Sequence, residues 1–210
     1  PKNARNGWLD GVRILDLCNV IAGPHSAAYL ARFGAEVIKL DPAKPFYDAW
    51  NTVIYGMSHM RGKRSLLTDI QTPKGKEILK KLVGEVDVVV WNAPDRQITE
   101  MGLDIEGLQQ LNPDVVFCKL DCFSGVRPGP RTGYLGYDDL VQASTGIMLR
   151  FGGAMDTPEE HAHVGTIDVM CGFAGALGIA AALYQSLKTG NAGRARTSLS
   201  ALSGLAQIPF

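Results

Sequence analysis

Asp168 is the residue whose position most suggests chemistry. It stands directly before a stretch, residues 169–187, that carries no charge and is rich in Gly and Ala, which predicts a helix buried in a protein interior. A carboxylate in front of such a helix can accept backbone N–H bonds as an N-cap. The same carboxylate, ionised and aimed by the helix terminus, can attack a carbonyl as a nucleophile. The residues alone leave both interpretations open.

Two histidines in an acidic loop form a second candidate. His161 and His163 make an H-x-H pair beside Glu159 and Glu160, which are residue types that bind metals. The segment supplies no third ligand at helical spacing. We therefore expect a solvated loop and no metal ion.

Aromatic and basic residues gather in the irregular parts of the sequence. Tyr47, Trp50, Tyr55 and Trp91 fall near the expected ligand edge, where they either pack in the ordinary way or hold an organic cation on their ring faces. The basic cluster 61–64 either lies on a solvated surface or holds phosphate groups. Neither pair of alternatives is decided by the sequence.

Composition limits the kinds of partner. The chain has 210 residues, 21 basic against 21 acidic side chains and 46% hydrophobic content, which suits one folded domain. A balanced charge gives no reason to expect nucleic acid or an anionic membrane as a partner. The four cysteines lack CxxC spacing and fit reduced thiols in a cytoplasmic protein. The absence of an initial Met, and an end within an apolar stretch, predict that residues 1–210 are part of a longer polypeptide.

The order of the elements predicts an α/β fold with an open parallel sheet. A strand at 12–18, a helix that Pro24 opens and Gly34 closes, and a strand at 36–40 make one βαβ unit. Thr72 and Pro73 begin another helix, and further elements follow. We expect helices at 73–83, 95–101, 104–111, 137–148 and 169–187, strands at 87–91, 115–120 and 196–199, and irregular chain between the second strand and Thr72.

In such sheets ligands bind beyond the carboxyl ends of the strands. The segments expected there are 19–24, 41–62, 91–95 and 121–137, and none contains a G-x-G-x-x-G or Walker motif. The usual nucleotide fingerprints are therefore missing.

Several ordered segments together resemble the class III (CaiB/BaiF) CoA-transferase family. The matching segments are 11–17, 22–24, 33–40, 61–66, 101–103, 111–113, 136–138, 142–143 and 188–190. The resemblance implies the large, Rossmann-like domain of an interlocked dimer, with the small domain absent. It also implies that an aspartate takes CoA from an acyl-CoA as an aspartyl-CoA thioester and passes it to a small carboxylic acid. The matching residue is Asp168, and no metal is implied.

The resemblance also assigns a binding site. It implies coenzyme A contacts, as co-substrate, from Asn19, Val20, Ile21, Lys63, Asn92 and Met101, and substrate contacts from Tyr137 and Trp50. Three positions depart from the family pattern, because Pro42, Glu100 and Leu135 stand where formyl-CoA transferase has basic residues. The grip on the CoA phosphates is therefore expected to be altered.

The resemblance leaves alternatives within the family. The α-methylacyl-CoA racemases have a G-H-D motif where this chain has Gly136-Tyr137-Asp138, and tyrosine is a poor base at neutral pH, so transferase chemistry is favoured. A tandem subgroup attaches CoA to dimethylsulfoniopropionate and then eliminates dimethyl sulfide, and this chain resembles its second domain. Such a domain is either catalytic or a non-catalytic half. The expected partner is a second copy or a tandem domain.

Overall fold

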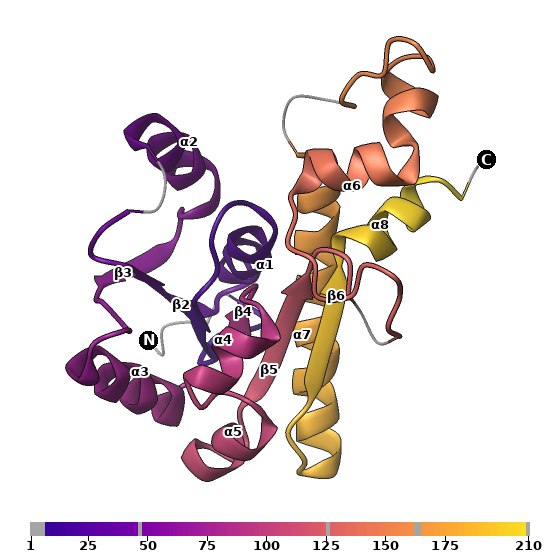
Figure 1. Ribbon diagram of the computed structural model, residues 1–210. Helices are drawn as coiled ribbons and strands as arrows, with labels where there is room; N and C mark the ends of the chain where they lie inside the picture. The colour runs from indigo at the N-terminus through magenta and orange to yellow at the C-terminus, as the bar shows by residue number, and fades with distance from the viewer. Residues whose placement is uncertain (1–6, 46–47, 125–126, 162–164, 209–210) are drawn as a thin grey trace.

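The computed structural model describes residues 7–45, 48–124, 127–161 and 165–208. These residues form a six-stranded parallel sheet in the order β3-β2-β1-β4-β5-β6 (Figure 1). This is the strand order of doubly wound nucleotide-binding folds, which confirms the predicted α/β class. The strands are β1 (Arg13–Asp16), β2 (Glu36–Asp41), β3 (Lys63–Leu67), β4 (Val88–Trp91), β5 (Val116–Asp121) and β6 (Arg194–Ser198).

Helices cover both faces of the sheet. Alternate strand residues point to opposite faces, so that Ile14 packs in one apolar cluster and Leu15 in the other. Helices α1 (Ala22–Ala31) and α7 (Thr166–Thr189) cover the first face, and α3 (Pro73–Glu85), α4 (Asp95–Glu100) and α5 (Ile105–Leu111) cover the second. In Figure 1, α7 passes behind β5 and β6 while α4 and α5 lie in front.

Most predicted elements are confirmed with shifted ends. The Thr72 side chain accepts a hydrogen bond from the Gly75 N–H, as expected of the cap that begins α3. The region expected to be irregular instead contains α2 (Ala49–His59) and β3. Leu199 does not end the last strand but begins α8 (Leu199–Ala206). The predicted helix at 137–148 is divided into α6 (Asp138–Thr145) and a π-helical turn, η1 (Met148–Gly152).

The apolar helix α7 packs along α1, β5 and β6. Its glycines permit this close packing, because a Cβ atom on Gly172 would lie 2.9 Å from the Ala22 carbonyl oxygen. The opposite face of α7 is exposed, with Leu177 and Tyr184 at its surface. Within the described residues, α7 is the helix long and apolar enough to cross a membrane by composition. Here its buried face lies against the sheet, as the sequence predicted.

Candidate active site at the carboxyl edge of the sheet

The loop between β1 and α1 is fixed at the switch point of the sheet, where the strand order reverses. The Asn92 side chain holds Asn19 by two hydrogen bonds, accepting from its backbone N–H at 3.1 Å and donating to its carbonyl at 2.9 Å. Val20 follows with a φ of +67°, a left-handed conformation that is rare for a β-branched residue. Such strain persists only where neighbours enforce it and is common at functional sites. Asn92, predicted to contact CoA, thus braces the predicted CoA loop.

Lys63 lies beneath this loop. Its ammonium is 1% exposed, pairs with the fully buried carboxylate of Asp16 at 2.7 Å and donates to the Pro24 carbonyl at 2.7 Å. The other Asp16 oxygen accepts the N–H of Cys18. The charge of Lys63 is thus neutralised inside the protein, and its contact with CoA stays a prediction.

Asp168 lies in the first turn of α7 and is 6% exposed. It is the third residue of the helix, so the expectation that it is the N-cap is wrong, and Gly165 occupies that position with a φ of +62°. A Cβ atom on Gly165 would lie 3.6 Å from Oδ2 of Asp168 and 3.2 Å from Cδ1 of Ile21. Gly165 thus separates the carboxylate from the loop after β1 by a narrow gap.

Burial and neighbouring carboxylates dominate the electrostatics of Asp168. Burial, then the negative charges of Asp138 and Asp139, raise the pKa of Asp168 to about 7. Burial, followed by the charge of Asp168, also raises the pKa of the Tyr55 hydroxyl. The same two causes raise the pKa of the Cys122 thiol to about 12. A buried carboxylate among acidic groups is typical of a functional site.

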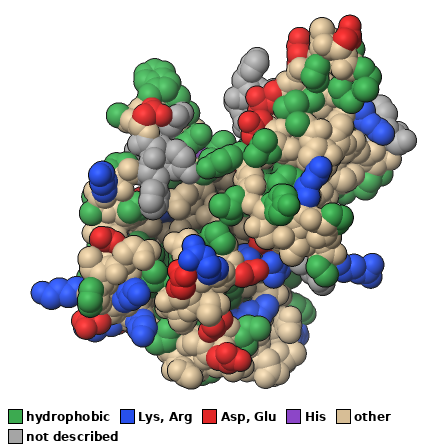
Figure 2. All heavy atoms as spheres, in the orientation of Figure 1, with side chains coloured by type: hydrophobic (Ala, Val, Ile, Leu, Met, Phe, Trp, Pro, Cys, Tyr) green, Lys and Arg blue, Asp and Glu red, His purple; other side chains and the backbone are tan. Residues whose placement is uncertain are grey.

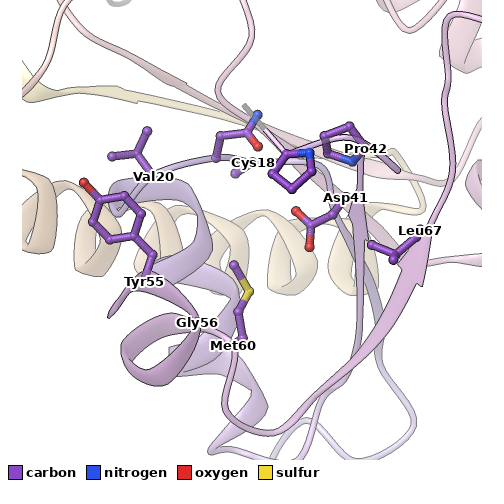
Figure 3. A pocket seen from close by; sticks show the side chains of 10 residues that line it. Cys18, Val20, Asp41, Pro42, Tyr55, Gly56, Met60 and Leu67 are labelled. Carbon is purple, nitrogen blue, oxygen red and sulfur yellow. The ribbon is translucent and has the colours of Figure 1, made fainter. Parts of the chain in front are cut away.

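A cavity of about 220 Å³ opens beside this loop. Tyr55 of α2 and Met60, which follows that helix, form one wall, and the side chains of Val20 and Asp41 also face the space (Figure 3). Tyr55 lines the cavity, and the charge of Asp168 contributes to the raised pKa of its hydroxyl. Tyr55 therefore relates the position of the cavity to that of Asp168. The molecular surface is hollowed between the lobe of α2 and the lobe of α6 and η1 (Figure 2). The lining residues are Cys18, Asn19, Val20, Asp41, Pro42, Pro45, Tyr55, Gly56, Met60 and Leu67.

The remaining predicted contacts divide into two groups. Tyr137 is half-exposed at the start of α6, outside the cavity lining, and its charge is among the causes that raise the pKa of Tyr55. Trp50 is exposed on α2, outside the cavity lining. Met101 is buried in the apolar cluster under α4, where the core encloses its side chain, and its contact with CoA stays a prediction. Trp91 is likewise a core residue.

The three departures from the family pattern also differ in position. Pro42 lines the cavity, whereas Leu135 is 73% exposed and Glu100 pairs with Arg96 along α4. Tyr47 and His163 lie outside the described residues. Over the described ranges, no three His, Cys, Asp or Glu side chains gather as a metal site.

Sequence reasoning missed two residues of the site, Asp138 and Gln142. They are one helical turn apart, and they stand in the matching segments 136–138 and 142–143. The signal available in the sequence was an acid and an amide at i, i+4 spacing. Their burial and their contact with α7 depend on the tertiary fold.

Comparison with known proteins identifies the class to which this fold and site belong. Residues 9–206 match the family described as CoA-transferase family III, and the chain belongs to that family. A CaiB/BaiF family protein from Brucella suis has the same fold, with a TM-score of 0.85 and 30% identity over 97% of this chain and 56% of that one. Rv3272 from M. tuberculosis gives a TM-score of 0.86 at 27% identity, over 97% of this chain and 56% of that one.

Among individual relatives, the chain is 58% identical to the CoA-transferase/lyase DddD of Marinomonas sp. (strain MWYL1), over 97% of its own length and 24% of that protein. It is 32% identical to the succinate–glutarate CoA-transferase of Agrobacterium fabrum, over 87% of this chain and 48% of that protein. The chain thus spans about a quarter of DddD and about half of the Agrobacterium enzyme.

Proposed function

We propose that this chain carries the CoA-transferring site of a CoA-transferase/lyase, with Asp168 as the covalent carrier of CoA. The carboxylate of Asp168 carries this proposal, because it is buried in the first turn of α7 and lies across Gly165 from the strained loop after β1, whose residues Asn19 and Val20 line the cavity. The family and the similarity to DddD support the same reaction class.

In the proposed reaction, the ionised carboxylate of Asp168 attacks the thioester carbonyl of an acyl-CoA. The carbon–sulfur bond breaks as an anhydride bond forms, and CoA leaves as a thiolate. The thiolate then attacks the aspartyl carbonyl, which releases the donor acid as a carboxylate and leaves CoA on Asp168 as a thioester. An acceptor carboxylate reverses these steps. The donor, aspartyl and acceptor thioesters are similar in free energy, so the exchange requires no ATP.

The chain's own residues support these steps in two ways. The N-terminus of α7 carries a partial positive charge, which stabilises the oxyanion that develops beside Asp168. The loop at 19–21 lies between the carboxylate and the cavity, where it can position the thioester arm.

The cavity suits part of the CoA molecule, because its lining is mostly apolar with a few polar groups. We propose that Lys44 contributes to binding the CoA phosphates, since it is exposed between the cavity-lining Pro42 and Pro45. Lys44 would offer the phosphates a solvent-facing positive charge, whereas the ammonium of Lys63 is paired with Asp16. We expect Lys44→Ala to raise KM for acyl-CoA about fivefold to tenfold with kcat unchanged, the size of one charge-assisted contact. An unchanged KM would exclude this role.

The similarity to DddD also supports a particular acceptor acid. We propose dimethylsulfoniopropionate, with subsequent release of dimethyl sulfide, and a site in which Tyr137 and Trp50 contact the sulfonium group through their ring faces. We further propose a cytoplasmic location and, as partner, a second copy or the other half of a tandem chain.

Trapping the covalent intermediate tests the nucleophile directly. The intact polypeptide that carries this chain is incubated with acyl-CoA and then hydroxylamine, which converts an aspartyl thioester to a hydroxamate. Mass spectrometry should find the modification on Asp168, and Asp168→Asn should abolish both labelling and transfer. An active Asp168→Ala variant would refute the proposal and would assign this chain as a non-catalytic half.

A further inference from the structure

A carboxylate from α6 caps the helix that carries Asp168. The N-cap residue Gly165 has no side chain to offer, and the N–H of Asp168 donates instead to Oδ2 of Asp138 at 2.7 Å. Asp138 is 5% exposed and Asp168 is 6% exposed. Two buried carboxylates thus stand at one helix terminus, and one of them holds the backbone of the other.

Gln142 fixes the role of Asp138 in this pair. The N–H of His161 donates to Oε1 of Gln142 at 2.7 Å, which assigns the other amide atom as nitrogen. That nitrogen donates to Oδ1 of Asp138 and, at 3.4 Å, to the His161 carbonyl. Both oxygens of Asp138 therefore accept hydrogen bonds, from Gln142 and from the backbone of Asp168. Asp138 is thus the acceptor shared by the Gln142 amide and the first turn of α7.

We propose that Asp138 is a positioning residue that holds the first turn of α7 and places a negative charge beside Asp168. Asp138 thereby sets the pH above which Asp168 becomes a nucleophile. This inference rests on the proposed nucleophilic role of Asp168. The groups that shift the pKa of Asp168 include no cation. A positioning role gives a reason for the burial of the Asp138 carboxylate beside it.

Other titratable groups face Asp168 from each packed element, and they do not replace Asp138 in this role. Asp139 adds a weaker negative charge but donates and accepts nothing at α7 in the described contacts. The remaining groups are neutral at pH 7, since burial raises their pKa values. They are Tyr55 of α2, Cys122 after β5 and Cys171 of α7.

The test compares three variants in the intact polypeptide. Asp138→Asn removes the charge but leaves two amide donors facing each other, because the new amide meets that of Gln142. Asp139→Asn removes the same charge one residue away without touching the hydrogen bonds. The double variant Asp138→Asn/Gln142→Glu keeps the short hydrogen bonds, since the new carboxylate accepts from both the new amide and the N–H of His161. It loses only the 3.4 Å contact to the His161 carbonyl, and it moves the charge from position 138 to position 142.

The readouts are the pH profile of hydroxylamine trapping at Asp168 and the titration of its carboxyl followed by ¹³C NMR. We expect Asp138→Asn to move the midpoint down by about one pH unit or more and to slow trapping at least about tenfold. Asp139→Asn should shift the midpoint less and leave the rate nearly unchanged. The double variant should recover most of the rate while its midpoint stays below that of the parent.

Two results would overturn the inference. One is an unchanged midpoint in Asp138→Asn, and the other is an equal effect of the two single variants, which would reduce the role to net charge. If Asp138→Asn fails to fold, the double variant makes the same comparison with the hydrogen bonds intact. A separate result, full transfer by Asp168→Ala, would refute the proposed function itself, so the two failures are distinguishable.

Discussion

Asp16 and Asp168 are both buried aspartates near the carboxyl edge of the sheet, yet their surroundings are opposite. Asp16 is fully buried, with the ammonium of Lys63 at 2.7 Å and a backbone donor on its other oxygen. Asp168 is almost as buried, but the charged groups that shift its pKa are two further carboxylates. One site is neutral as a pair, and the other accumulates negative charge.

The charge of the neighbouring groups distinguishes a structural aspartate from a chemically active one better than residue type or burial does. A buried carboxylate that is paired and hydrogen-bonded holds elements together, here β1, β3 and the start of α1. A buried carboxylate with like charges is costly to maintain, so its persistence indicates a function. The comparison predicts that substitutions at the two aspartates change different measured quantities.

Substitution of Asp168 should have the largest effect on activity. Asp168→Asn preserves the shape of the side chain but removes the nucleophile, so we expect transfer by the intact polypeptide to fall at least about 10⁴-fold. Steady-state kinetics with acyl-CoA and an acceptor acid measures this change. Near-parent activity in a correctly folded variant would place the nucleophile elsewhere.

Substitution of Asp16 should instead reduce stability. Asp16→Asn leaves the Lys63 ammonium buried without its counter-charge, which we expect to lower the free energy of unfolding by about 3–5 kcal/mol. The matched control is Asp16→Leu/Lys63→Met, which removes both charges and should recover most of that loss. Denaturant titrations measure both variants. A double variant no more stable than the single one would show that the pair contributes little beyond packing.

The sequence predicted the fold well because its signals are local. Apolar runs identified β1, β4 and β5, the Thr72-Pro73 pair marked the start of α3, and the uncharged run marked α7. The segment with α2 and β3 escaped detection, because β3 is an edge strand whose pattern is mostly exposed. Asp168 was also found, through its place before an apolar helix.

The chemical roles of the other residues depended on tertiary contacts. Lys63 was expected to face a phosphate, but the fold turns its ammonium toward Asp16. Met101 belongs to the same ordered segments and lies in the core. Asp138 meets α7 across a separation of 30 residues. The matching segments thus indicated where the site lies. The direction of each side chain is determined by tertiary contacts, which only the folded structure shows.

The charge on Asp168 also predicts a pH dependence of stability. Its pKa is raised from the ordinary value of 3.8 to about 7, so the folded state disfavours the ionised form. Stability is therefore greatest below about pH 4 as far as this group is concerned, and falls as pH rises toward about 7, by on the order of 2–4 kcal/mol. Asp168→Asn should remove this fall.

Denaturant titrations of both proteins at about pH 5 and about pH 8 measure this change. The variant should gain stability relative to the parent at the higher pH, and a constant difference would contradict the assignment.

The smallest predicted effect concerns Val20, which sharpens the comparison because its loop begins after Asp16 and reaches Gly165, the residue beside Asp168. Its φ of +67° costs about 1–3 kcal/mol, since a β-branched side chain crowds the backbone in this region. Val20→Gly relieves that strain, while Val20→Ala keeps a Cβ atom in it, and both remove the side chain that lines the cavity. We expect the glycine variant to be more stable than the alanine variant by about 1 kcal/mol, the reverse of the usual order. Both variants should raise KM for acyl-CoA to a similar extent, whereas an alanine variant as stable as glycine would mean that the loop relaxes and that Asn92 does not enforce its conformation.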